Sequence, residues 1–242
     1  MNSKLSNTQT RLRVATRNCN MAFRNKCERL LSFAPDIAVI QECEKPERWP
    51  EIGARSIVWC GDNEHKGLAV VTFGEWKAEH ASLSLADLRH FLPLQVTGKI
   101  AFQLLGVWAM QTCAVGLAYV AQVREAVSRC GDWLAAAPSL VVGDLNGNAI
   151  WDRHRTNNFM STVSMLEAAG LASAYHRVRA EAFGEESRST LHLHRNKAKP
   201  YHIDYVFVPQ PWAERIRRVH VGKYEEWRAY SDHCPVVVDL VL

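Results

Sequence analysis

The chain has 242 residues, of which 48% are hydrophobic and 22% are charged, which is sufficient for one globular domain with a sizeable core. Residues 1–10 are polar and do not resemble a signal peptide, and no apolar run is long enough to span a membrane. The seven cysteines are odd in number and include no CxxC pair, which argues against a disulfide framework or a structural zinc site. We therefore expect a cytoplasmic monomer that does not bind membranes, with a flexible tail over residues 1–10 and a single domain over 11–242.

The net charge of +4 is unevenly distributed along the chain. Residues 1–30 carry seven Lys or Arg and one acid, and residues 188–228 carry nine Lys or Arg and four acids. If the two basic segments meet on one face, that face would suit a polyanionic partner such as nucleic acid. Ordinary solvated surface would give the same counts, so charge alone does not identify the partner.

The first third of the chain predicts a strand, a helix and a second strand. Basic and apolar residues alternate from Arg11 to Thr16, which indicates a strand. Apolar residues at helical spacing predict an amphipathic helix over 23–33. Residues 37–40 are wholly apolar and end in Gln41 and Glu42, as expected of a buried strand. This order is typical of α/β proteins, which place their sites at strand ends.

Short apolar segments separated by glycine and polar turns follow between residues 52 and 110, and they predict antiparallel pairing. The expected strands in this region are 57–59, 68–71, 91–94 and 100–105. The expected helices are 117–134 and a second one that begins at Asn157 or Asn158 and runs to Ala169, before Gly170. The remaining expected strands are 140–142, 189–193, 201–208, 215–221 and 236–240. The fold class predicted is α/β, with two mixed β-sheets packed face to face and helices outside.

Polar residues at the ends of the expected strands are the candidates for chemistry. Asp144 and Asn146 are two positions apart at a strand end, so an extended backbone would place both on one side. Asp144 could accept a proton from water, and Asn146 could orient that water. The competing interpretation is an Asx turn in which both side chains satisfy only the backbone.

Three more side chains extend this candidate site. Glu42 is the natural first ligand for a hard divalent cation, which prefers oxygen donors and retains water. A water polarised near Glu42 and deprotonated by Asp144 would be a competent nucleophile. His233 could donate to a phosphoryl oxygen, held in its tautomer by a carboxylate such as Asp204.

Five short segments together resemble the endonuclease/exonuclease/phosphatase superfamily. In chain order they are Asn18-Cys19-Asn20, Gln41-Glu42, Gly143-Asp144-Leu145-Asn146, His202-Ile203-Asp204-Tyr205 and Ser231-Asp232-His233. Each is weak alone, but their order over residues 11–242 makes the combination specific. The resemblance implies a four-layered α/β sandwich and a Mg²⁺ or Mn²⁺ cofactor.

The resemblance also implies a role for each matching residue. Asn18 and Glu42 would serve the metal centre. The catalytic residues implied are Asp144, Asn146, Asp204, Asp232 and His233. In these roles Asp144 and Asn146 would activate and orient the attacking water, Asp232 and His233 would close the site, and Asp204 would pair with His233.

The sequence departs from the family pattern at two positions. Arg17 stands where the family usually has Trp, and Trp108 lies near the position where apurinic endonucleases have a catalytic Tyr. Trp151 could either stack on a base or fill the core. The candidate substrate contacts are Asn20, Arg17, Trp108, Trp151 and His202.

These features predict a metal-dependent phosphodiesterase, with DNA hydrolysis as the favoured activity and in-line attack as the mechanism. One alternative is a phosphatase or phosphodiesterase of a small phosphorylated metabolite or lipid headgroup. A second, suggested by Arg17, is a catalytically inactive nucleic-acid-binding module. The sequence does not separate endonuclease from exonuclease, or DNA from RNA.

Overall fold

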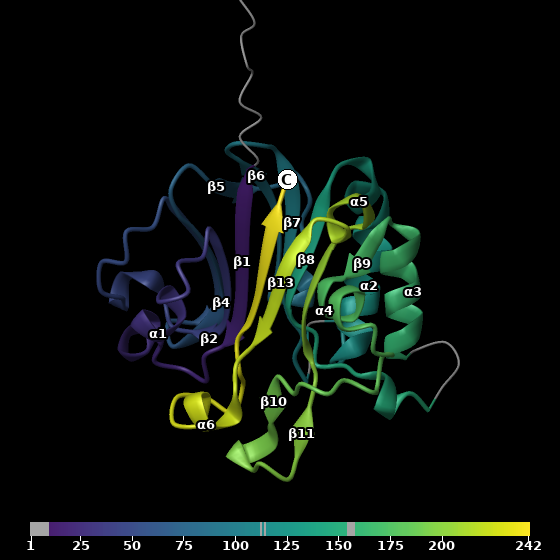
Figure 1. Ribbon diagram of the computed structural model, residues 1–242. Coiled ribbons are helices and arrows are strands. Elements are labelled where there is room, and N and C mark those ends of the chain that lie inside the picture. The colour runs from purple at the N-terminus through teal and green to yellow at the C-terminus, as the bar shows by residue number, and fades with distance from the viewer. Residues whose placement is uncertain (1–9, 112, 114, 154–157) are drawn as a thin grey trace, which may run out of the picture.

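The computed structural model describes residues 10–111, 113, 115–153 and 158–242. Two six-stranded sheets pack face to face, with α1 (Cys27–Leu31) on one side and α2 (Val120–Ala136) and α3 (Phe159–Ala168) on the other (Figure 1). The predicted fold class is therefore confirmed. The tail predicted for residues 1–10 lies, apart from Thr10, outside the described residues, and Thr10 exchanges two backbone hydrogen bonds with Leu242.

The first sheet is built around a parallel pair, β1 and β2, flanked by antiparallel strands. Its spatial order is β13 (Ile216–Val221), β14 (Val236–Val241), β1 (Arg11–Asn18), β2 (Ile37–Cys43), β4 (Lys66–Thr72) and β3 (Ser56–Asn63).

The second sheet repeats this plan around the parallel pair β7 and β8. Its spatial order is β5 (Lys77–His80), β6 (Phe91–Thr97), β7 (Phe102–Trp108), β8 (Ser139–Asp144), β12 (Asp204–Pro209) and β9 (Leu171–Ser173). A separate two-stranded hairpin extends from the lower end of the molecule in Figure 1 and consists of β10 (Leu191–His192) and β11 (Pro200–Tyr201).

Short helices complete the chain. They are α4 (Ala174–Arg179), α5 (Gln210–Ala213), α6 (Tyr224–Trp227) and the 3-10 helices Phe23–Asn25, Pro46–Arg48, Ala86–Leu88, Ala149–Trp151 and Leu193–Arg195. None of the helices in the described part of the chain is long and apolar enough to cross a membrane.

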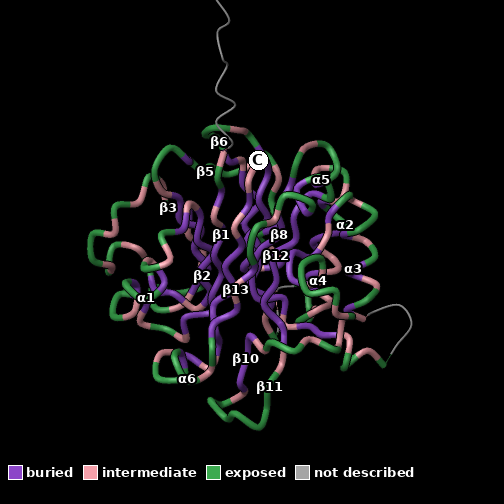
Figure 2. Tube along the Cα trace, in the orientation of Figure 1, coloured by how far each residue is buried: buried purple, intermediate pink, exposed green. Residues whose placement is uncertain are grey.

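Alternation along the strands produces three apolar layers. Leu12, Val14 and Val39 face Leu104 and Val142 across the space between the sheets. The opposite faces of the two sheets pack against the outer helices, so the strands in the middle are buried while the outer turns are exposed (Figure 2). The four layers predicted from the sequence are thus helix, sheet, sheet and helix.

The single helix predicted over 23–33 is wrong, because the chain forms a 3-10 turn and then the short helix α1. Lys26 separates the two with φ −136°, and its ammonium donates to the carbonyls of Cys19, Asn20 and Met21 at 2.8, 3.0 and 2.9 Å. Asn20 and Met21 have left-handed backbone angles. The sequence pattern reported the buried side correctly but not this local backbone conformation.

Other boundaries moved for identifiable reasons. The strand predicted over 100–105 begins at Phe102, because Phe102 pairs with Val96 and leaves Ile100 in the connecting turn. The strand predicted over 201–208 is divided before Asp204, where the Thr190 hydroxyl accepts hydrogen bonds from the backbone N–H of residues 203 and 204. The strand predicted over 189–193 is reduced to two residues, and β5, β9, α4, α5 and α6 were not predicted.

The helix predicted over 117–134 is shifted to Val120–Ala136. The helix predicted to begin at Asn157 or Asn158 begins after Asn158, whose side chain accepts from the Ser161 N–H in a capping box. Residue 157 lies outside the described part of the chain.

Candidate active site

The polar strand ends converge at the lower end of the sandwich, where both sheets present the ends of β1, β2 and β8 (Figure 1). Gln41 bridges the two sheets there, since its amide donates to Thr16 Oγ1 at 3.0 Å and to the Val107 carbonyl at 3.4 Å. Asp144 on β8 lies directly opposite Asp204 on β12 in the antiparallel register. Residues separated by more than a hundred positions in sequence are therefore brought to one edge.

Gly143 is required for the approach of β8 to β7. Its φ of 147° lies in the region that favours glycine, and a Cβ at this position would come within 1.9 Å of the Val107 carbonyl oxygen. Any side chain would push β8 away and displace the Asp144 carboxylate that follows. The glycine before Asp144 is thus a geometric requirement of the site.

Asp204, His233 and Asp144 form a buried cluster at the centre of the site. His233 Nδ1 donates to Asp204 Oδ2 at 2.9 Å, and His233 Nε2 lies 4.0 Å from Asp144 Oδ2. The loop before β14 is fixed by Ser231, whose hydroxyl accepts from the His233 N–H at 3.0 Å and donates to the Asn18 carbonyl at 2.9 Å. The imidazole is therefore held with one nitrogen on Asp204 and the other facing Asp144.

Burial and neighbouring charges change the pKa of both Asp144 and His233. Burial raises the pKa of the Asp144 carboxyl to about 7, and the nearby Asp204 carboxylate adds to this rise. Burial opposes the charge on His233, but the Asp204 carboxylate outweighs it and the pKa of His233 rises to about 10. Both shifts favour protonation, so His233 is biased towards the cation and Asp144 binds a proton more tightly than an exposed carboxylate does.

Asn18 links this cluster to Glu42. Its amide nitrogen donates to Glu42 Oε1 and to Asp144 Oδ2, both at 3.1 Å, and its oxygen accepts from the Asn20 N–H at 3.0 Å. The side chain thus turns its nitrogen, not its oxygen, towards Glu42. In this arrangement Asn18 orients two carboxylates, and its role as a metal ligand stays a prediction.

Glu42 is presented by an irregularity in β2. The register with β4 shifts between Gln41 and Cys43, and Glu42 has a φ of 59°, which is uncommon for a residue with a side chain. Its Oε2 lies 3.1 Å from the Lys66 ammonium at the start of β4, and its side chain retains 21% exposure. The bulge directs the carboxylate into the site instead of into the sheet.

The donor set at Glu42 fits a hard divalent cation. Its carboxylate is partly open to solvent, as a metal that keeps several waters requires, and an incoming metal would compete with the Lys66 ammonium for Oε2. Asp144, Asp204 and His233 also have ligand atoms within 4.8 Å of one another. A metal bound within that trio would have to displace the proton on His233, because only a neutral imidazole nitrogen is a ligand.

The remaining predicted catalytic residues lie beside this centre. The Asn146 N–H donates to Asp144 Oδ1 at 3.0 Å, and its side-chain amide donates to the Ala109 carbonyl at 2.7 Å. The Asp232 carboxylate accepts from the Asn20 amide at 3.2 Å. The structure therefore brings together all the predicted catalytic and metal-site residues, together with Asn20.

Three predicted substrate contacts are buried. Arg17 is 1% exposed and stacks on Trp227 with its guanidinium carbon 4.2 Å from the ring centroid, and burial lowers the pKa of Arg17 to about 10. Trp108 packs against His90, with ring centroids 4.5 Å apart. His202 contacts the Arg188 carbonyl at 2.7 Å through Nδ1. In this conformation none of the three offers substrate an open surface.

Lys66 is a site residue that the sequence reasoning missed. Its ammonium pairs with Glu42 and lies 5.2 Å from the centroid of the Trp108 ring. The available signal was its position before an apolar strand, in a turn bounded by Gly61 and Gly67. That signal predicts a hairpin, but it does not show that Lys66 lies next to Glu42, because this proximity depends on the pairing of β4 with β2.

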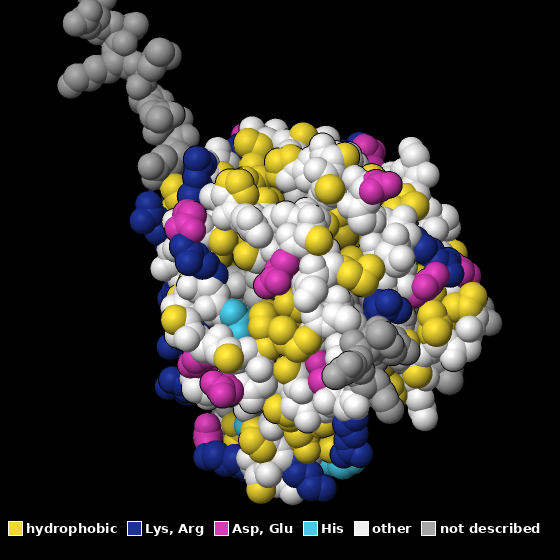
Figure 3. Space-filling view, turned by 90° about the vertical axis from the view of Figure 1, so that its right-hand side faces the viewer, with side chains coloured by type: hydrophobic (Ala, Val, Ile, Leu, Met, Phe, Trp, Pro, Cys, Tyr) yellow, Lys and Arg dark blue, Asp and Glu magenta, His cyan; other side chains and the backbone are white. Residues whose placement is uncertain are grey.

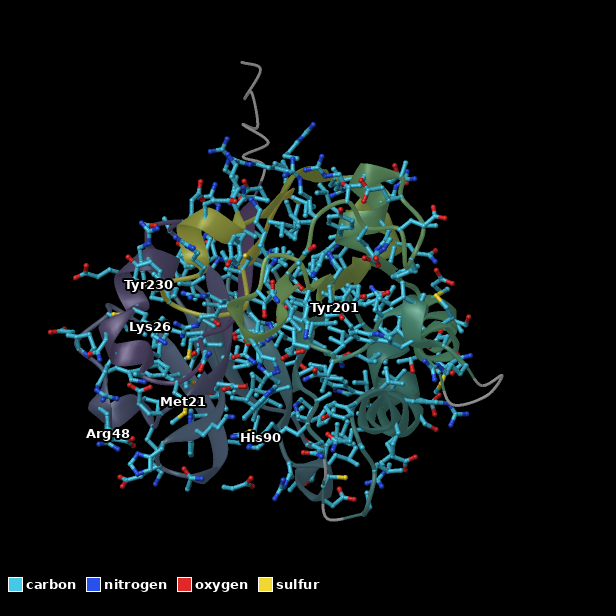
Figure 4. All side chains as sticks on the ribbon, turned by 90° about the horizontal axis from the view of Figure 1, so that it is seen from below. Met21, Lys26, Arg48, His90, Tyr201 and Tyr230 are labelled. Carbon is cyan, nitrogen blue, oxygen red and sulfur yellow. The ribbon has the colours of Figure 1, made fainter. Side chains whose placement is uncertain are left out.

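Viewed from the site end, side chains from distant parts of the chain surround the centre. Met21 and Lys26 lie on the α1 side, Tyr201 on the opposite side and His90 between them near the lower edge (Figure 4).

Solved structures share this fold over almost the whole chain. A Neisseria 3′ phosphatase, NExo, bound to a product DNA hairpin has a TM-score of 0.70 and 18% identity, covering 95% of this chain and 99% of that chain. A 3′–5′ exonuclease from Neisseria meningitidis has a TM-score of 0.69 and 18% identity, covering 95% and 99%. An AP endonuclease from Archaeoglobus fulgidus has a TM-score of 0.68 and 18% identity, covering 94% and 98%.

Comparison by sequence gives no corresponding result, since no protein-family model and no curated protein matches the chain. The structural neighbours share the two-sheet α/β sandwich over almost the whole chain, so the fold implied by the sequence resemblance is confirmed.

Proposed function

We propose that this protein is a divalent-metal-dependent phosphodiesterase and that its substrate is DNA. The observation that carries the proposal is the Asp204–His233–Asp144 cluster facing Asn18 and Glu42 at the junction of the two sheets. Support for the substrate class comes from neighbours of the same fold, which include DNA-processing enzymes and one complex with a product DNA hairpin.

The residues divide the chemistry of in-line attack between them. Asp144 accepts the proton of the attacking water, for which its pKa of about 7 is well matched to neutral pH. The Asn146 side chain helps to orient that water. The His233 cation, fixed by Asp204, donates from Nε2 to a phosphoryl oxygen as negative charge develops there.

The metal side of the site is assigned to Glu42. A Mg²⁺ or Mn²⁺ ion bound there would neutralise phosphate charge and polarise a phosphoryl oxygen. Asn18 keeps the carboxylates of Glu42 and Asp144 at a fixed separation, and the Lys66 ammonium supplies positive charge beside the phosphate.

The test compares labelled double-stranded DNA, single-stranded DNA, RNA and a chromogenic phosphodiester with Mg²⁺, Mn²⁺ or EDTA. We expect metal-dependent cleavage of DNA that is lost in Asp144→Asn, with the fold retained by circular dichroism. Hydrolysis restricted to a small phosphate ester would favour the metabolite or lipid-headgroup alternative. Metal-independent DNA binding without any hydrolysis would favour the inactive binding module.

A further inference from the structure

A cavity of about 240 Å³ opens beside the catalytic loop on the side of α2 and α3. Asn146 forms part of its wall, so the cavity borders the candidate active site, and three aromatic side chains also line it. The residues that line the cavity include Tyr119, Asn146, Trp151, Asp152, Arg153 and Phe159. Its volume is below the roughly 300–1,000 Å³ of drug-sized sites, which suits one planar ring system.

Trp151 is exposed although it is large and apolar. It has 44% exposure, and one part of its surface packs against Tyr201 with ring centroids 5.0 Å apart, while it also lines the cavity. Tyr119, which also lines the cavity, is likewise 44% exposed. Exposed aromatic surface that borders a catalytic loop is typical of a ligand platform and not of a core.

Hydrogen bonds of Asn148 hold the backbone of the turn that carries Trp151. Asn148 accepts from the Ile150 N–H at 3.0 Å through its side chain, and its carbonyl accepts from the Trp151 N–H at 3.1 Å. The Asn148 amide in turn donates to the His202 carbonyl at 2.8 Å and to Glu186 at 3.1 Å. The platform is therefore ordered before any ligand arrives, which reduces the entropy cost of stacking.

The charges around the cavity suit a polyanion. Both Asp152 oxygens accept from the first N–H groups of α3, at 2.7 Å from Phe159 and 2.9 Å from Met160, so the helix terminus compensates its charge. Arg153 remains as an exposed cation in the lining. Hydrophobic side chains are visible over the middle of this side of the molecule, with Lys and Arg side chains at its lower edge (Figure 3).

We infer that this cavity binds an unpaired nucleobase next to the scissile phosphate, with the base stacked on Trp151. The inference rests on the proposed phosphodiesterase function and narrows its substrate to nucleic acid with a single-stranded or displaced nucleotide at the cleavage site. A base within an intact duplex is covered on both sides by its neighbours and presents no ring face to such a platform. Arg153 contacts the adjacent backbone phosphate.

The test measures affinity by fluorescence anisotropy with labelled oligonucleotides in EDTA, so that cleavage does not interfere. The probes are a single strand, the corresponding blunt duplex and a duplex with one unpaired nucleotide. Trp151→Ala should weaken binding of the single strand and of the unpaired-nucleotide duplex at least about tenfold, with a much smaller effect on the blunt duplex. Trp151→Phe should restore part of the loss because it retains a stacking ring.

Ile150→Ala is the matched control. Ile150 belongs to the same 3-10 turn and is 53% exposed, but it does not line the cavity, so its removal should leave all three affinities unchanged. Equal losses for single strand and blunt duplex in Trp151→Ala, or equal losses in Trp151→Ala and Ile150→Ala, would overturn the inference. So would Trp151-dependent binding to sphingomyelin–phosphatidylcholine vesicles without a nucleic-acid effect, which would assign the platform to lipid.

Failure of this inference can be separated from failure of the proposed function. A wild-type protein that hydrolyses DNA but binds single strands no better than Trp151→Ala would overturn the subsite alone. A wild-type protein that shows the Trp151-dependent preference but hydrolyses no phosphodiester would overturn the proposed activity and retain the subsite.

Discussion

Replacement of Asp204 by Asn tests the centre of the proposed site, because it removes one charge and keeps an acceptor for His233 Nδ1. The two side chains are buried and 2.9 Å apart, and Asp204 is the main reason that the pKa of His233 rises from 6.5 to about 10 despite burial. Without the carboxylate, burial should lower the pKa of His233 from about 10 towards 6.5. At neutral pH His233 would then be mostly uncharged.

The expected loss of activity in Asp204→Asn follows from the change in the pKa of His233. A fall from about 10 to 6.5 corresponds to about 5 kcal/mol at about 1.36 kcal/mol per pH unit, as an upper bound, because Asp144 and Asp232 also favour the cation. Loss of most of this interaction from the transition state would lower kcat/KM by about 10³-fold. His233→Ala should lower it to a similar extent.

The assay is a double-mutant cycle on a fluorogenic oligonucleotide, with Asp204→Asn, His233→Ala and the combined variant. The two residues act through one hydrogen bond, so the combined variant should lose little more than either single one. The same variant should also change the pH dependence of the rate in a defined direction. His233 is charged below its pKa, so the alkaline limb of the rate profile should move from near pH 10 towards pH 6.5 in Asp204→Asn.

Small and additive losses in this cycle would refute the coupling of Asp204 with His233. An unchanged alkaline limb in Asp204→Asn would refute it independently, even if the rate fell. Circular dichroism and the Tm of each variant serve as controls, since a rate loss that accompanies partial unfolding would carry no information about the pair.

Three further predictions concern the metal, the partner and the buried network beneath the site. Glu42→Gln should raise the Mg²⁺ or Mn²⁺ concentration for half-maximal activity at least about tenfold, since a carboxamide is a weaker ligand for a hard cation; an unchanged metal titration would remove Glu42 from the site. DNA affinity should fall steeply with salt because residues 1–30 and 188–228 are basic; a flat log–log plot of affinity against salt would contradict this. Burial opposes the charge on Glu186, but hydrogen bonds from His176 and Asn148 outweigh this effect and lower the pKa of Glu186 to about 2. Ionised Glu186 should therefore stabilise the fold by up to about 3 kcal/mol above pH 4.5. This contribution should be lost as the pH falls towards 2. Urea unfolding of wild type and Glu186→Gln across this range measures it, and a difference between the two proteins that does not shrink below pH 4.5 would count against the network.

The sequence alone determined the main layers and predicted the residues of the candidate site. Alternating and continuous apolar segments are local signals, and they located the central strands β1, β2, β8 and β14 because each is buried by its own pattern. Polar residues at the ends of β1 and β2 and in the loop before β14 meet at one edge, because β1 and β2 are parallel and β14 runs antiparallel to β1. The order of Glu42, Asp144 and His233 along the chain, through the family resemblance that it carries, predicted that they belong to one site.

The tertiary structure decided how the side chains of the site are oriented and which further residues lie beside them. The bulge that turns Glu42 into the site depends on the register between β2 and β4, and the proximity of Lys66 depends on the same pairing. Arg17 was predicted to contact the substrate, but its guanidinium is buried against Trp227, which comes from near the other end of the chain. Periodicity reports which side of an element is buried, whereas register, strain and long-range packing are set by partners that a local pattern does not contain.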